Sequence, residues 1–223
     1  EDYYIDMVRD YAEHKILDEA EAGFNLTGFY GKDADWPSVI NACKRYPMFA
    51  ERQVVLLKEA QQMKDIDKLE SYFEHPLSST IFVIAYKTKT YDKRTKLYKL
   101  LKQSAEIFTS EKLKDFKVQE WIKEMVMGKG YSISSKAVGL LEEHIGNDLT
   151  RMANEIDKLS INLKGRKEIT EDDIEKFIGI SKEYNVFELQ AAIAKKDLAK
   201  AIKIIQYFEG NPKAAPIQMV LPA

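Results

Sequence analysis

The sequence is poor in the residues that form disulfides and bind metal ions. Cys43 is the only cysteine among 223 residues, which excludes a disulfide framework and a thiolate metal cluster within the chain. Because Cys43 falls on an apolar helical stripe, we expect it in the core. The three histidines, His14, His75 and His144, lie far apart without metal-ligand spacing, so surface positions and no metal site are expected.

Long apolar runs and a secretory leader are also missing. No run approaches the roughly 18 apolar residues of a membrane span, and no signal peptide is visible. We therefore expect no membrane contact and a location in the reducing cytoplasm. Both ends look cut, since Glu1 falls in the first turn of a helical pattern and the last residues are the apolar stretch Ile217–Leu221. We expect further residues at each end.

An excess of charge of one sign is absent. The chain has 34 Lys and Arg against 36 Asp and Glu, a net charge of -2, so it lacks the basic field that dominates nucleic-acid binding. The lysine-rich segment Lys87–Lys102 could contact phosphates, but neighbouring acids cancel much of its field, which favours a solvated helix face. Any DNA contact is therefore expected to be indirect or weak.

The 45% of apolar residues is enough for a sizeable core, and their pattern in the first half predicts a parallel sheet. Strand-like segments alternate with helical ones, which is typical of crossover units with helices on both faces of the sheet. The expected strands are Phe24–Tyr30, Gln53–Leu57, Thr80–Ala85 and Glu106–Phe108. The expected helices are Asp2–Ala20, Trp36–Cys43 with Asp35 as N-cap, Asp65–His75 and Lys93–Gln103.

The second half reads as helical. Ser134 and Thr170 are expected N-caps, and Thr170 with Asp173 resembles a capping box. The expected helices are Val118–Met127, Ser134–His144, Asp148–Leu163, Thr170–Ile178, and a further helical segment from Val186 through Asp197–Phe208. We predict an α/β domain at 1–117, a small helical domain at 118–182, and the start of another helical domain at 183–223.

An α/β domain followed by a four-helix domain is typical of nucleotide-driven proteins, yet the phosphate-handling residues are missing. No glycine begins the pattern Gly-x-x-x-x-Gly-Lys-[Ser/Thr], and the first helix opens with the acids Glu1 and Asp2 where phosphate would lie. Lys58 precedes Glu59 where an aspartate would help to hold Mg²⁺, and lysine cannot do so.

Two further positions of this expected nucleotide site also depart from the pattern. Lys87 ends the strand where a polar asparagine would sense the γ-phosphate, and Leu149 stands where such folds often supply an arginine. With Lys58 and Glu59, these residues mark a degenerate nucleotide site, and no cofactor is expected.

The segment Arg45–Gln53 places two large apolar residues, Met48 and Phe49, directly after Pro47 and before a buried strand. Proline stops the preceding helix and biases Tyr46 towards an extended conformation. The pattern alone leaves two interpretations open, a first contact of the core or an exposed apolar plug for a partner's pocket.

Several blocks in register resemble the delta subunit of the bacterial DNA polymerase III clamp loader, a non-ATPase family with an AAA+-like fold. Each block is weak alone, and together they cover nearly the whole chain. They are Tyr3–Asp6, Pro47–Val55, Pro76–Thr80, Asp92–Arg94, Trp121–Ile122, Gly146–Leu159 and Asn185–Leu189.

The resemblance implies an AAA+-like α/β domain, a helical lid and a helical collar. It further implies binding to the ring-shaped sliding clamp, whose interface the protein opens or holds open during DNA replication. Met48 and Phe49 would enter an apolar pocket of the clamp, with Arg45, Tyr46, Pro47 and Arg52 close by. One departure concerns Arg45 and Tyr46, which stand where clamp-binding peptides usually begin with a glutamine.

The family also implies partners and an assignment as a non-enzyme. The chain would join the loader's ATPase subunits and delta prime through the collar, in a holoenzyme whose nucleotidyltransferase activity lies in other subunits. Two alternatives stay open: an AAA+ ATPase whose phosphate loop precedes Glu1, and a structural adaptor in which Met48 and Phe49 belong to the core.

Overall fold

The computed structural model describes residues 1–181 and 183–211, which divide into two compact units with the boundary between Lys112 and Leu113. Each unit is considered separately below. The break falls five residues before the predicted end of the α/β domain at 117. The predicted boundary between a second domain ending at 182 and a third starting at 183 stays a prediction. Residues 212–223 of the third predicted domain, which include the apolar stretch Ile217–Leu221, lie outside the described residues.

The first unit is built on a parallel sheet, as predicted. Its strands are β1 (Leu26–Tyr30), β2 (Gln53–Lys58) and β3 (Thr80–Ile84), in the order β1-β2-β3. Val55 of the central strand lies opposite Thr27 on one side and Phe82 on the other. The run Val54–Leu57 is buried throughout, which explains why β2 is apolar on both faces.

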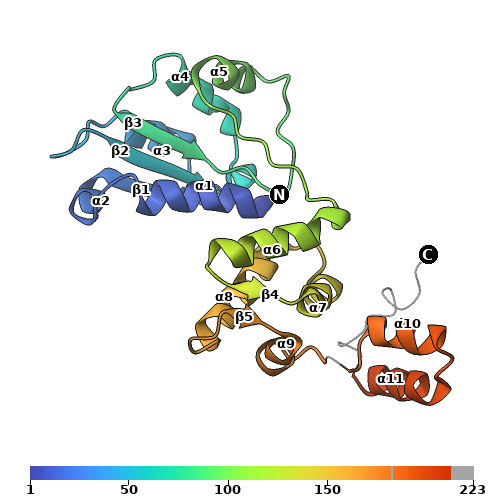
Figure 1. The fold of residues 1–223 in the computed structure, drawn as a ribbon. Helices are drawn as coiled ribbons and strands as arrows, with labels where there is room; N and C mark the ends of the chain where they lie inside the picture. Colours follow the sequence, from blue (N-terminus) through green and yellow to red (C-terminus); the bar gives the residue numbers. More distant parts are fainter. Residues whose placement is uncertain (182, 212–223) are drawn as a thin grey trace. The chain divides into compact units, whose positions relative to one another are not determined.

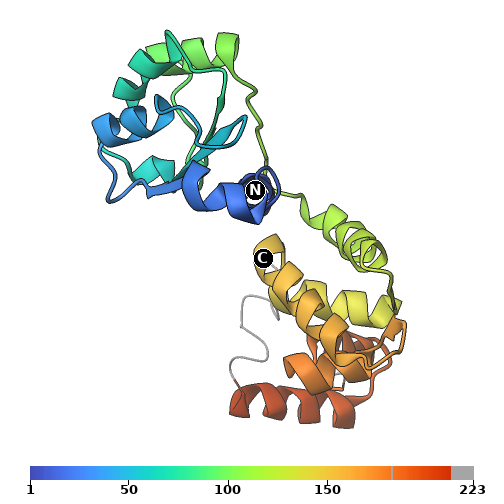
Figure 2. The same cartoon turned by 90° about the vertical axis from the view of Figure 1, so that its left-hand side faces the viewer.

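Helices cover both faces of this sheet (Figures 1 and 2). The side chains of β2 alternate between the two layers. Val55 and Leu57 pack in a core with residues of α3 (Trp36–Cys43), the short helix η2 (Ile66–Leu69), α4 (Glu70–Phe73) and α5 (Lys96–Ser104). Val54 and Leu56 face the opposite layer, where they pack with Ala12 of α1 (Asp2–His14). The alternation of a strand therefore produces a three-layer fold.

Two boundaries near the start differ from the prediction. The helix expected at Asp2–Ala20 is divided, because Asp18 accepts a hydrogen bond from the Glu21 backbone at 2.8 Å and starts α2 (Glu19–Asn25). Phe24 and Asn25 consequently end a helix, whereas the alternation of apolar and polar residues had placed them in a strand.

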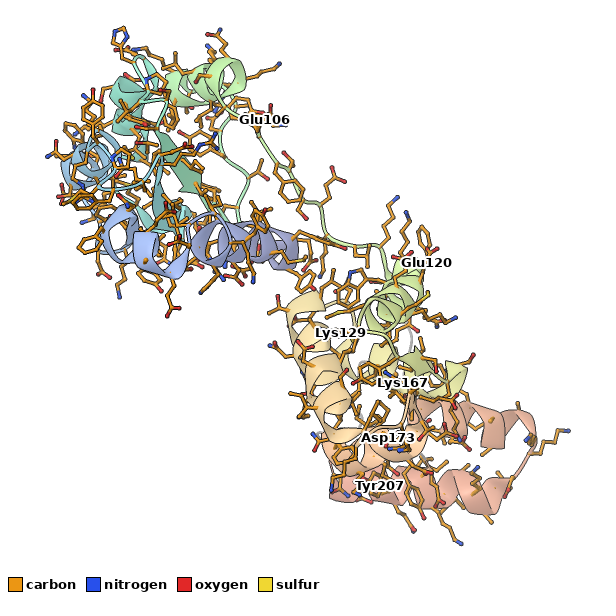
Figure 3. All side chains as sticks on the ribbon, turned by 60° about the vertical axis from the view of Figure 1, so that its left-hand side comes forward. Glu106, Glu120, Lys129, Lys167, Asp173 and Tyr207 are labelled. Carbon is orange, nitrogen blue, oxygen red and sulfur yellow. The ribbon has the colours of Figure 1, made fainter. Side chains whose placement is uncertain are left out.

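The remaining departures in this unit concern weakly patterned segments. Residues Glu106–Phe108 form no strand in the structure: the segment after α5 is exposed, as Figure 3 shows around the labelled Glu106. The expected helix Asp65–His75 is broken into η2 and α4, and α5 begins at Lys96, where Thr95 caps it, instead of at Lys93. A further short helix, η1 (Ala60–Gln62), follows β2.

The second unit begins with the helical domain that the sequence predicts. It contains η3 (Asp115–Lys117), α6 (Val118–Gly128), α7 (Ser135–Ile145), α8 (Leu149–Asn162) and α9 (Glu171–Ile178). Ser134 caps α7, and Thr170 with Asp173 forms the predicted capping box of α9. The sequence carries no signal for the parallel pair β4 (Ser132–Ile133) and β5 (Glu168–Ile169), because two residues are too short for a period.

Two amphipathic helices complete the described chain, α10 (Val186–Ala194) and α11 (Leu198–Gly210). Leu189 and Ile204 lie in the core between them, while Leu198, Ile202 and Ile205 are more than half exposed along α11. In the part of the chain that the structure describes, no helix has both the length and the apolar character needed to cross a membrane.

Candidate functional site: an exposed apolar loop and an ion-paired sheet edge

The loop between α3 and β2 presents Met48 and Phe49 to solvent. Met48 is 53% exposed and Phe49 is 94% exposed, so neither side chain belongs to the core of this unit. Tyr46 is also exposed, at 77%, and Pro47 is partly buried. Large apolar side chains gathered at one exposed loop are typical of an interaction site.

The buried amide of Gln53 holds the beginning of this loop. Its Nε2 lies 2.5 Å from the Arg45 carbonyl oxygen, 2.8 Å from Thr80 Oγ1 and 3.0 Å from the Ala42 carbonyl oxygen. The two N–H groups of the amide are shared among these acceptors. Gln53 thereby ties the end of α3 to the first residues of β2 and β3.

A second buried amide, that of Asn25, holds the middle of the loop. The Met48 backbone N–H donates to Asn25 Oδ1 at 2.7 Å, and Asn25 Nδ2 donates to the Met48 carbonyl at 2.8 Å. The same nitrogen donates to the Glu21 carbonyl oxygen at 3.1 Å. Asn25 is 2% exposed, so these bonds are shielded from water.

Residues around the apolar pair are polar or aromatic. Arg45 donates to Thr27 Oγ1 at 2.8 Å, which turns the arginine back onto β1.

The exposed residues of this region include some that the sequence predicted and some that it did not. Arg52 is exposed, and Phe24, the neighbour of Asn25 on α2, is 65% exposed. The predicted site residues Arg45, Tyr46, Met48, Phe49 and Arg52 are thus all exposed on one loop. The sequence did not predict that Phe24 and Asn25 belong to this region. It placed Gln53 at the end of the segment Arg45–Gln53 but did not predict its role in holding the loop.

The carboxyl ends of the strands carry a separate set of charges, contributed by positions that the sequence predicted as a degenerate nucleotide site. Lys58, the last residue of β2, lies with its Nζ 2.6 Å from Glu13 Oε1 on α1. Lys87, three residues after β3, is 9% exposed, and its Nζ lies 2.5 Å from Asp6 Oδ1 and 3.1 Å from Glu59 Oε1. Side chains of α1 therefore neutralise both lysines.

This network shifts the acid–base properties of its members. The hydrogen bond from Lys87 holds the pKa of Glu59 below its ordinary value, with help from Gln61. Burial works to lower the pKa of Lys87, but hydrogen bonds and charge from Asp6 and Glu59 outweigh it and raise that pKa. Gln61 Oε1 also accepts the Lys87 backbone N–H at 3.0 Å. Lys87 and Glu59 therefore both stay charged near neutral pH.

Leu149, the fourth degenerate position, is a core residue of the helical unit. It is fully buried at the start of α8, where Asp148 caps the helix by accepting a hydrogen bond from the Arg151 backbone at 2.9 Å. A buried leucine offers no charge to a phosphate. The structure thus brings Lys58, Glu59 and Lys87 together at one sheet edge and places Leu149 in the other unit.

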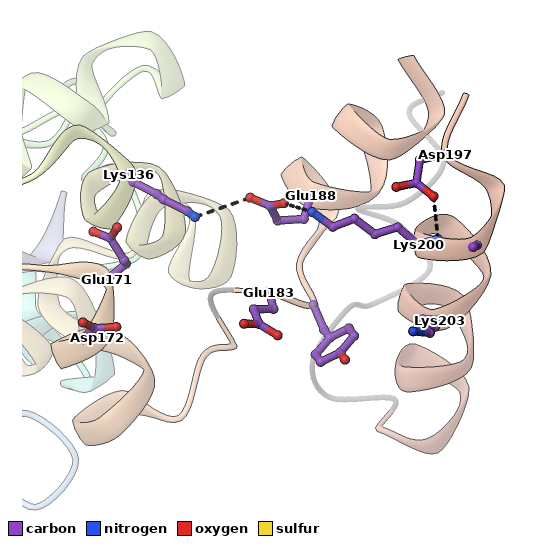
Figure 4. Close-up of a pocket in the computed structure, with 10 residues that line it drawn as sticks. Lys136, Glu171, Asp172, Glu183, Glu188, Asp197, Lys200 and Lys203 are labelled. Carbon is purple, nitrogen blue, oxygen red and sulfur yellow. Dashed lines mark hydrogen bonds and ion pairs between the residues drawn. The ribbon is translucent and has the colours of Figure 1, made fainter. Parts of the chain in front are cut away.

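The helical unit has a hollow of about 650 Å³ with a mixed-charge lining (Figure 4). Glu188 on α10 lies between Lys136 and Lys200, at 3.4 Å and 2.5 Å, and the hydrogen bond from Lys200 lowers the pKa of Glu188. Five acidic side chains and three lysines line the hollow, so its excess charge is negative and does not favour an anionic ligand such as a phosphate. Within residues 1–181 and 183–211, no group of three or more His, Cys, Asp or Glu is arranged to hold a metal ion.

Fold and site together define an α/β protein with a parallel sheet, an internally paired sheet edge and an exposed apolar loop. Residues 6–111 match the model of the family described as "DNA polymerase III, delta subunit". This segment spans nearly the whole α/β unit, and the match confirms the resemblance inferred from the sequence. It includes Met48, Phe49, Lys58 and Lys87.

One protein and one solved structure are similar to this chain over most of its length. The DNA polymerase III subunit delta of Bacillus subtilis is 26% identical over 199 residues, which cover 85% of this chain and 57% of that protein. The structure of the Bacillus subtilis DNA clamp loader delta protein (YqeN) superposes with a TM-score of 0.63 at 24% identity, covering 97% of this chain and 67% of that one. The chain therefore spans little more than half the length of its curated relative.

A more distant structural match also occurs. A RuvB mutant of Thermotoga maritima gives a TM-score of 0.45 at 15% identity, over 76% of this chain and 60% of that one.

Proposed function

We propose that this chain is a clamp loader subunit of the delta type, which binds the sliding clamp through Met48 and Phe49 and opens or holds open its ring during DNA replication. The observation that carries the proposal is the 94% exposure of Phe49 beside a half-exposed Met48. A folded domain gains nothing from holding these side chains in water, whereas a partner with an apolar pocket would bury both.

Energetic arguments support such an attachment. Complete burial of a Phe or Met side chain contributes roughly 1.5–3 kcal/mol each. The pair can therefore supply a substantial part of a reversible association, and its attachment to a loop held at Arg45 and Met48 reduces the ordering needed on binding. The remaining residues, Tyr46, Pro47, Arg45 and Arg52, would form the rim of the contact.

A binding titration of the full-length protein against its cognate sliding clamp tests this function. The double variant Met48→Ala/Phe49→Ala should bind at least about 100-fold more weakly, from the loss of the two apolar contacts. Met127→Ala/Ile161→Ala is a matched control, because these side chains are 66% and 82% exposed on α6 and α8. Unchanged affinity of the Met48/Phe49 variant, with normal folding, would exclude the proposed contact.

We also propose that the chain itself hydrolyses no nucleotide. At the carboxyl ends of β2 and β3, Lys58 pairs with Glu13, and Lys87 pairs with Asp6 and Glu59. Neither lysine is therefore free to bind a phosphate. The alternative, an ATPase whose phosphate loop precedes Glu1, predicts tight Mg²⁺-ATP binding by calorimetry of the full-length protein. Absence of a binding heat, together with clamp binding, would favour the non-ATPase role.

The other partners follow from the same proposal. The loader's ATPase subunits and delta prime would bind through the collar that begins with α10 and α11, whose exposed Leu198, Ile202 and Ile205 are available for contact. DNA contact would remain indirect or weak: Lys87 is buried in ion pairs, and Lys96 pairs with Glu70 and Glu74. Such a subunit acts in the cytoplasm with the replication machinery.

A further inference from the structure

Asn25 is a buried polar side chain that forms hydrogen bonds with the backbone of the exposed loop. Its Oδ1 accepts from the Met48 backbone N–H, and its Nδ2 donates to the Met48 carbonyl, at 2.7 and 2.8 Å. This two-point pairing repeats the pattern that links residues of adjacent strands. The second N–H of the amide donates to the Glu21 carbonyl oxygen, which fixes the side chain to its own helix.

Phe49, the residue after Met48, has a backbone conformation that needs such support. Its φ of 55° lies in the left-handed region, which a bulky residue without a supporting contact rarely adopts. At 94% exposure the Phe49 side chain itself makes little contact with the unit. The conformation must therefore be held through the backbone, and Asn25 fixes both hydrogen-bonding groups of the preceding residue.

We infer that Asn25 is a positioning residue for clamp binding: its two bonds to Met48 hold the loop in the shape that presents Met48 and Phe49 together. The inference rests on the proposed function and extends it. A loop held in its bound shape loses less conformational freedom on association, so the clamp's apolar pocket meets a pre-organised ligand. Without the amide, the peptide groups of Met48 would turn to water and Phe49 would leave the left-handed region.

The test is a double-mutant cycle on affinity for the cognate sliding clamp, measured with the full-length protein. Asn25→Ala should weaken binding by about tenfold, and Phe49→Ala should weaken it more. In the double variant the loss of affinity should be smaller than the product of the two single losses, because Asn25 acts through the position of Phe49. A role confined to general stability would give independent effects. Asn41→Ala, on the exposed face of α3, is the matched control and should bind normally.

Two further measurements separate positioning from folding. Amide hydrogen exchange at Met48 should speed up in Asn25→Ala, while amides of the central strand β2 keep their protection. Should Asn25→Ala fail to fold, Asn25→Asp replaces it, since this variant retains the acceptor for the Met48 N–H and loses the donor to the Met48 carbonyl. It should bind less tightly than the natural protein.

The outcomes are distinguishable. Wild-type affinity in a folded Asn25 variant, or multiplying effects of Asn25→Ala and Phe49→Ala, would overturn the positioning role and leave the proposed function intact. An unchanged affinity of Phe49→Ala would instead remove the clamp contact itself, and the role of Asn25 with it.

Discussion

The ammonium group of Lys87 lies 2.5 Å from a carboxylate oxygen of Asp6, so a buried ion pair joins the segment after β3 to the first helix. Glu59, just beyond β2, completes the group at 3.1 Å. Helix α1 is thereby attached to the carboxyl ends of two neighbouring strands. Lys87 and Glu59, which the sequence predicted as positions of a degenerate nucleotide site, therefore connect parts of the protein to each other.

Loss of the Lys87 charge should therefore destabilise the α/β unit. Lys87→Met removes the cation that Asp6 and Glu59 share, while Arg9 still pairs with Asp6, and we expect the free energy of unfolding to fall by about 2–3 kcal/mol. Urea denaturation measures this change. Lys96→Met, which breaks the exposed pairs with Glu70 and Glu74, should cost less than about 1 kcal/mol. Equal effects of the two variants would contradict a structural role for the buried network.

Stability of the helical unit should fall at low pH through Asp173. Burial works to raise the pKa of this carboxyl, but hydrogen bonds from Arg166 and Thr170 outweigh it and hold the pKa below the ordinary 3.8. The unfolded state then binds more protons in this range, so the contribution of Asp173 is present above about pH 4 and is lost as the pH falls through the lowered value.

Asp173→Asn provides the measurement for this pH dependence. The substituted amide would keep the shape of the side chain without its charge, so the variant should be less stable at pH 7 by about 1–2 kcal/mol. Thermal denaturation between about pH 7 and pH 2 should show the gap between the two proteins narrowing below about pH 4. A gap that stays constant would show that the carboxylate charge contributes nothing.

The Cys43 thiol should be unreactive in the folded protein. Its side chain is fully buried on α3, and burial raises the pKa of the thiol to about 12, so almost no thiolate forms at about pH 8. A disulfide-exchange reagent should therefore label Cys43 slowly in buffer and rapidly in denaturing urea. Fast labelling of the folded protein would place this residue at the surface and contradict the packing of α3.

Removal of the Gln53 amide should loosen the start of the exposed loop. Gln53→Ala leaves the Arg45 carbonyl and Thr80 hydroxyl without their shared donor, and we expect a loss of about 1–3 kcal/mol in the free energy of unfolding. Gln103→Ala, on the exposed end of α5, should change stability by less than about 0.5 kcal/mol. Hydrogen exchange of the loop amides would show whether the loss is local to Arg45–Met48.

Strong local patterns allowed much of this fold to be predicted. The apolar run of β2, the caps Asp35, Ser134 and Thr170, and the helices α6 to α9 follow from periodicity and capping chemistry, which act within a few residues. Predictions were wrong where the pattern was short, as for Glu106–Phe108 and for β4 and β5. Phe24 and Asn25 alternate like a strand, yet the cap at Asp18 and bonds to Glu21 and Met48 place them in a helix.

Sequence alone determined the residue types at the two sites: an apolar pair after Pro47, and lysines at positions 58 and 87 where nucleotide chemistry needs other groups. Tertiary structure decided that Met48 and Phe49 face solvent, and that Lys58 and Lys87 pair with Glu13 and Asp6, which lie far away along the chain. Such contacts depend on how the chain folds back on itself. A local pattern does not show which distant side chain will form hydrogen bonds with a given backbone group, as the Asn25 amide does with the backbone of Met48.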